Sequence, residues 1–145
     1  MRLSTALLTH LVVAALAGCG SSTSSSSLPA PSTTDVSLDQ QFTLAPGQTA
    51  RIPGQGLAIR FDSVAGDSRC PQDVVCVWAR DAAVHLTLTR NGTTRAVVVH
   101  TTLEPRTAAD GAVQLELLGV APNTDSRRPI PQAEYRVRLQ ASIGG

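Results

Sequence analysis

The sequence predicts an all-β domain, built as an antiparallel β-sandwich or small barrel of about seven strands. Three observations carry this prediction. From residue 36 onward, apolar and polar residues alternate with a period of two in several short segments. Gly, Pro and Asn separate these segments, and no stretch after residue 36 has helical periodicity. Each strand is apolar on one side only, as in antiparallel sheets that pack one face against a core.

The expected strands follow one another at short intervals. The segments 42–44 and 49–52 are bounded by Pro46-Gly47 and Pro53-Gly54, which are strong turn signals. Residues 57–64 alternate so that Leu57, Ile59, Phe61 and Ser63 are expected on one face. Later strands are expected over residues 84–89, 94–101, 113–117 and 135–141.

Two of these segments predict a β-hairpin with a defined register. Asn91-Gly92 lies between them, and this dipeptide tolerates the positive φ angles of tight hairpin turns. A two-residue turn pairs His85 with Val98, and Ala83 with His100. The two histidines are then diagonal neighbours on the solvent face, roughly 7–8 Å apart.

The N-terminus has the layout of a secretory signal. Arg2 supplies a positive charge, an apolar stretch follows, and small residues lead to Cys19. At roughly a dozen residues, the apolar stretch is too short to span a bilayer, which needs about 20. We therefore expect residues 1–18 to be a signal peptide, 19–35 a Ser/Thr/Pro-rich tether, and 36–145 the β domain. The tether would reach roughly 20 Å.

Leu16-Ala17-Gly18-Cys19 resembles the lipobox of bacterial lipoproteins. The resemblance implies that Cys19 becomes the first residue of the mature chain and carries acyl chains, which would anchor the protein to a membrane. The implied location is the cell envelope, with the domain in the periplasm or at the cell surface. Gly20 favours the outer membrane if the host is Gram-negative.

If Cys19 is lipidated, Cys70 and Cys76 remain, and outside the inner membrane they are expected to form a disulfide. A catalytic thiol would need a poised base, and a zinc site would need two further ligands; the sequence shows neither. Trp78 is expected to pack over the bridge or to cap the core edge. Asp67, Arg69 and Asp73 flank the bridge, as a local ion-pair network or a recognition patch.

The run Asp67-Ser68-Arg69-Cys70-Pro71, followed after a short spacer by Cys76-Val77-Trp78-Ala79, resembles a group of small bacterial secreted proteins and lipoproteins. The group implies a β-rich exported domain without an assigned activity. Arg80 stands where the group often has Gly. This departure leaves open whether a tight turn follows Trp78.

Composition and motifs narrow the expected function. The chain has no lysine, and its formal net charge of +1 argues against nucleic acid as a partner. The motifs of common enzyme classes are missing. We expect a non-catalytic binding or accessory module without a cofactor, whose recognition loop is Asp67–Trp78 and whose partner is an envelope protein or a small ligand. The alternatives are a copper- or zinc-handling protein that uses His85 and His100, and a hydrolase with an unrecognised site.

Overall fold

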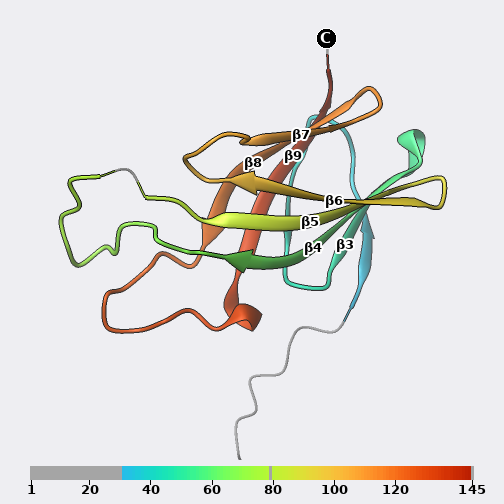
Figure 1. Cartoon of the computed structure of the whole chain (residues 1–145). Coiled ribbons are helices and arrows are strands. Elements are labelled where there is room, and N and C mark those ends of the chain that lie inside the picture. Colours follow the sequence, from blue (N-terminus) through green and yellow to red (C-terminus); the bar gives the residue numbers. More distant parts are fainter. Residues whose placement is uncertain (1–30, 79, 145) are drawn as a thin grey trace, which may run out of the picture.

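A computed structural model describes residues 31–78 and 80–144, and it shows a β-sandwich (Figure 1). The expected signal peptide, Cys19 and most of the expected tether lie outside these residues. The strands in chain order are β1 (Thr33–Asp35), β2 (Gln41–Leu44), β3 (Thr49–Ile52), β4 (Leu57–Ala65), β5 (Ala83–Arg90), β6 (Thr93–His100), β7 (Thr107–Asp110), β8 (Val113–Ala121) and β9 (Arg136–Ile143). Two single-turn 3-10 helices, η1 (Pro53–Gln55) and η2 (Gln132–Glu134), precede β4 and β9.

The strands form two sheets that pack face to face. One sheet has the order β1-β3-β4-β5-β6, and the other has the order β2-β9-β8-β7. All pairs are antiparallel except β1 with β3, which is parallel. The all-β prediction is confirmed. Of the two predicted architectures, the structure shows the sandwich, because the sheets do not close into a barrel.

Alternation builds the core, because every second residue of each strand points between the sheets. Phe61 of β4, Leu86 of β5 and Leu139 of β9 are fully buried there. Val137 and Ala141 of β9, and Tyr135 just before this strand, are also buried. No polar or charged residue of the described chain is buried in this core.

The β5–β6 hairpin has the predicted register. His85 pairs with Val98, and Ala83 pairs with His100. Asn91 and Gly92 occupy the turn with φ values of 49° and 81°, the positive angles that the dipeptide predicts.

Three features differ from the sequence prediction. A bulge between Phe61 and Ser63 turns Val64 into the core, so Ser63 does not share the face of Phe61 and instead lies opposite His85. β1 lies within residues assigned to the tether, so the folded unit begins at Thr33 rather than at residue 36. β1 and β7 were not predicted, because β1 has no buried residue and β7 does not alternate clearly.

Three connections meet at one end of the sandwich. The β4–β5 loop (66–82), the β6–β7 loop (101–106) and the β8–β9 loop (122–135) all extend to the left in Figure 1. The hairpin turn at Asn91-Gly92 lies at the opposite end. In the described residues, no helix has the length and apolar content needed to cross a bilayer.

Candidate functional site

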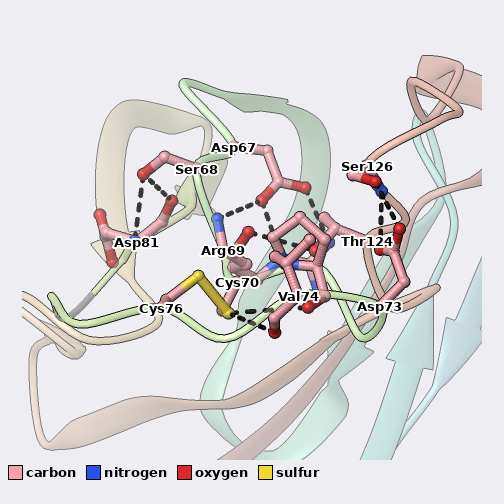
Figure 2. The surroundings of a disulfide bond; sticks show 11 residues. Asp67, Ser68, Arg69, Cys70, Asp73, Val74, Cys76, Asp81, Thr124 and Ser126 are labelled. Carbon is pink, nitrogen blue, oxygen red and sulfur yellow. Dashed lines mark hydrogen bonds and ion pairs between the residues drawn. A yellow bond between two sulfur atoms is a disulfide. The ribbon is translucent and has the colours of Figure 1, made fainter.

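The β4–β5 loop contains the predicted disulfide. Cys70 and Cys76 are bonded, with their Cα atoms 5.9 Å apart (Figure 2). Pro71 lies between them and is half-buried. The bridge closes the outer part of the loop into a small ring, so this ring has few conformations of its own.

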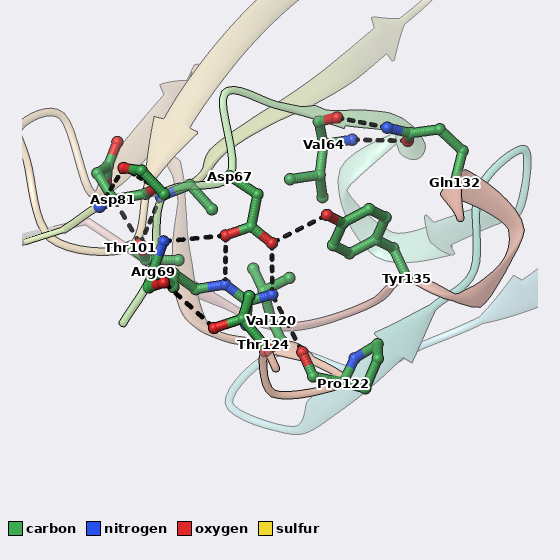
Figure 3. Close-up of polar contacts among 12 residues, drawn as sticks. Val64, Asp67, Arg69, Asp81, Thr101, Val120, Pro122, Thr124, Gln132 and Tyr135 are labelled. Atoms are coloured by element: carbon green, nitrogen blue, oxygen red, sulfur yellow. Dashed lines mark hydrogen bonds and ion pairs between the residues drawn. The ribbon is translucent and has the colours of Figure 1, made fainter. Parts of the chain in front are cut away.

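The base of the loop is fixed by an ion pair between Asp67 and Arg69. Nε and Nη2 of Arg69 donate to the two oxygens of the Asp67 carboxylate, at 2.9 and 2.7 Å. The two side chains are only 10% and 14% exposed, so solvent screens the pair weakly. The hydroxyl of Tyr135 donates to the same carboxylate at 2.9 Å (Figure 3).

These contacts shift two pKa values. Burial acts to raise the pKa of Asp67, but hydrogen bonds from Arg69 and Tyr135 outweigh it and lower this pKa below its usual value. Burial, together with the hydrogen bond and negative charge of Asp67, raises the pKa of Tyr135 to about 12. The carboxylate is therefore ionised and the phenol neutral throughout the physiological range.

Arg69 also joins the two sheets. Its Nη2 donates to the carbonyl of Pro122 at 3.0 Å, and its Nη1 donates to the carbonyl of Val120. In return, its own carbonyl accepts from the Thr124 hydroxyl at 3.2 Å. These contacts tie the β4–β5 loop of one sheet to the β8–β9 loop of the other.

Further hydrogen bonds strengthen the same connection. The backbone amide of Gln72 donates to the carbonyl of Thr124 at 2.9 Å. Asp73 accepts from the amide and the hydroxyl of Ser126 (Figure 2). Of the three residues that flank the bridge, only Asp67 and Arg69 therefore pair with each other. The partners of Asp73 are Ser126, which lies 53 positions further along the chain, and Arg127, whose Nε is 4.0 Å from its carboxylate.

Asp81 anchors the other end of the β4–β5 loop. Its Oδ2 lies 2.5 Å from Nδ1 of His100, and its Oδ1 accepts from the amide of Thr102 at 2.9 Å and from the hydroxyl of Thr101 at 3.1 Å. Burial acts to raise the pKa of Asp81, but these hydrogen bonds prevail and lower it to about 2. Because an ionised carboxylate can only accept, the shared proton belongs to His100.

Between these anchors, the loop exposes an apolar tip, which we define as Val74, Val75, Val77 and Trp78. Val75 is 96% exposed and Trp78 is 76% exposed. The expectation that Trp78 packs over the bridge or caps the core edge is therefore wrong. Near this end of the core, Tyr135 and Ala82 are the buried residues instead.

A cleft of about 690 Å³ lies between the β4–β5 and β8–β9 loops. The tip residues Val74 and Val77 line one side, and Ile130 of the β8–β9 loop contributes further apolar surface. Arg80 adds positive charge to the lining, whereas Arg127 is paired with Asp125, which also lines the cleft, at 3.0 Å. The cleft thus presents apolar and charged groups together, which is suited to binding a partner that is itself amphipathic.

The two histidines occupy their predicted positions but differ in environment. His85 is half-buried on the outer face of β5, whereas the imidazole of His100 is 23% exposed and hydrogen-bonded to Asp81. Residues 31–78 and 80–144 contain no group of three or more His, Cys, Asp or Glu side chains placed to hold a metal ion. Across the same residues, no Ser, Thr or Cys side chain is hydrogen-bonded to His100, so the Asp81–His100 pair lacks an adjacent nucleophile.

Sequence reasoning identified the loop but missed several residues that hold it. Tyr135 was expected only as the first residue of the last strand, and Asp81 was not singled out. Tyr135 contacts a residue 68 positions away, and Asp81 contacts one 19 positions away. The register of the β5–β6 hairpin could have suggested that the chain before Ala83 reaches His100, since these two residues pair.

Comparisons with protein-family models, with curated proteins and with solved structures return no match for this chain.

Proposed function

We propose that this protein is an exported, lipid-anchored binding module of the cell envelope. In this proposal, residues 1–18 direct export, Cys19 carries the lipid, and the following segment tethers the domain to a membrane. The disulfide supports export, because such bonds persist mainly in oxidising compartments. The lipobox-like residues 16–19 support the anchor, and the Asp67–Ala79 motif supports membership of the group of small secreted bacterial proteins that it resembles.

One observation carries the binding role: the apolar tip is held exposed by a rigid base. Val75 and Trp78 contribute nothing to the core, yet the loop that bears them has a disulfide and contacts two other loops. Large exposed apolar groups on a fixed loop are typical of recognition surfaces. Aromatic residues such as Trp also carry a large share of the binding energy where proteins meet.

The partner that fits this surface is an envelope protein with an apolar recess. Trp78 and Val75 would enter the recess of the partner. Polar residues around that recess would contact the cleft beside Arg80. Because the disulfide and the contacts at the loop base already restrict the loop, binding would lose less conformational entropy than with an unconstrained loop.

Site-specific photo-crosslinking in intact cells tests the proposal. The full chain would carry a photo-reactive amino acid in place of Val75. A matched chain would carry it in place of Thr94, which is exposed on β6 near the opposite end. We expect one discrete crosslinked species from position 75 and none from position 94.

Two results would contradict the proposal. Equal capture from both positions would show that the tip has no particular role in binding. Mass spectrometry of the same cell material provides the second check, because an intact leader without acyl chains on Cys19 would remove the anchor.

A further inference from the structure

A second polar site lies on the outer face of the sheet formed by β2, β9, β8 and β7. Arg136 and Arg138 follow one another on this face of β9, about 7 Å apart along the strand. Both border a hollow of about 390 Å³ between β9 and β8, which lie side by side in Figure 1.

The hollow exists because its floor is made of small residues. Gly119 of β8 pairs with Arg138, and Ala121 pairs with Arg136. The register shifts between Leu117 and Gly119, which places these small residues beside the two arginines. A Cβ atom built on Gly119 would lie 3.8 Å from Nη2 of Arg138, so a larger side chain at this position would enter the hollow.

The charge of the hollow is not neutralised by the described chain. Most arginines of residues 31–78 and 80–144 contact a carboxylate within 4.0 Å, and Arg51, Arg69 and Arg90 are examples. Arg136 and Arg138 contact none among these residues.

Most of the donors at the hollow remain free to bind a ligand. Nη1 of Arg136 is used on the carbonyls of Ala133 and Tyr135, and this holds the guanidinium in place while leaving Nε and Nη2. Thr43 and Asn123 complete the polar lining, and no acidic residue lines the hollow.

We propose that this hollow binds a phosphate-type oxyanion. Two unpaired guanidinium groups carry a charge of +2, and a phosphate monoester carries about −1.5 to −2 at pH 7. The planar fork of Arg matches the oxygen geometry of phosphate, and Thr43 and Asn123 can donate to the remaining oxygens. The ligand is either a soluble phosphate compound or the phosphate of a lipid headgroup.

The test titrates inorganic phosphate into the full-length protein in detergent, at pH 7.5 and constant ionic strength. NMR signals of the arginine Nε–Hε groups report the site. We expect saturable shifts at Arg136 and Arg138. Arg138→Gln should weaken binding by about tenfold or more, because a charge-assisted hydrogen bond is worth roughly 1.5–3 kcal/mol.

Two further variants separate the hollow from general surface charge. Gly119→Val keeps both arginines but fills the hollow, so it should also weaken binding by about tenfold. Arg106 also lacks a carboxylate contact in the described chain, but it lies in the β6–β7 loop and does not border the hollow. Arg106→Gln should therefore leave the affinity for phosphate unchanged.

Dimethyl phosphate, a monoanionic diester, distinguishes the two sources of phosphate. Weaker binding of the diester than of inorganic phosphate supports a soluble phosphate ligand, and equal binding supports a lipid headgroup. Shifts that fail to saturate would overturn the proposal, as would an equal loss of affinity in Arg106→Gln and Arg138→Gln.

Discussion

Replacing Asp81 by Asn should destabilise the protein at neutral pH and have little effect in strong acid. The carboxyl pKa falls from 3.8 to about 2 on folding, and each pKa unit corresponds to about 1.4 kcal/mol. The ionised carboxylate therefore contributes about 2 kcal/mol to the free energy of unfolding. This contribution is complete above pH 3.8 and is lost as the pH falls toward 2, because the unfolded chain then binds the proton more tightly.

Urea unfolding at pH 7 and pH 2 measures both quantities. At pH 7 the Asp81→Asn midpoint should lie about 1 M below that of the unchanged protein, given a typical slope of 1–3 kcal/mol per M. At pH 2 the two midpoints should nearly coincide. Other carboxylates, including Asp67, also lose stability in this pH range, so the difference between the two proteins isolates Asp81. If the difference between the two urea midpoints were equal at both pH values, the reasoning would be refuted, because the substitution would then have removed packing rather than charge.

Three further predictions concern the base of the loop and the core. The one tyrosine, Tyr135, should ionise near pH 12 in the folded protein, as read from phenolate absorbance, and titration near pH 10 would contradict its contact with a buried carboxylate. Replacing both Cys70 and Cys76 by Ser should lower the free energy of unfolding by about 2 kcal/mol from loop entropy alone, and an unchanged urea midpoint would show that the bridge adds no constraint. Phe61→Ala should lower the free energy of unfolding by about 3–5 kcal/mol, because the ring of Phe61 is fully buried. Phe42→Ala should lower it by less, because Phe42 is only half-buried. Equal losses in the two variants would contradict the assigned core.

The sequence was most informative where structure depends on neighbours in the chain. Alternation located β3, β4, β5, β6, β8 and β9, because a period of two specifies which face of a strand is buried. Asn91-Gly92 defined a turn of two residues, and that turn length set the pairing of every residue in the hairpin. The bulge between Phe61 and Ser63 escaped prediction, since one extra residue reverses the alternation without a sequence signal.

The loop end could be predicted only in part. The spacing of Cys70 and Cys76 predicted their bond, because both residues lie in one short segment. The orientation of Trp78 was not predictable, since it depends on how completely Tyr135 and other distant residues close the core. The partner of Asp73 was missed for the same reason, because Ser126 lies 53 positions away and approaches Asp73 only through the packing of the two sheets.

The disulfide alone does not explain why the apolar tip is held in place. It constrains the ring between Cys70 and Cys76, but the orientation of that ring relative to the sandwich depends on contacts at its base. Arg69 connects the base to the far sheet, and Asp81 connects it to the β6–β7 loop. The ring is thus fixed from two directions. Val75 and Trp78 are not part of the buried core, so folding alone gives no reason to place apolar side chains at these positions. The proposed binding role accounts for an apolar, exposed surface on a loop that is tied to the sandwich at its base.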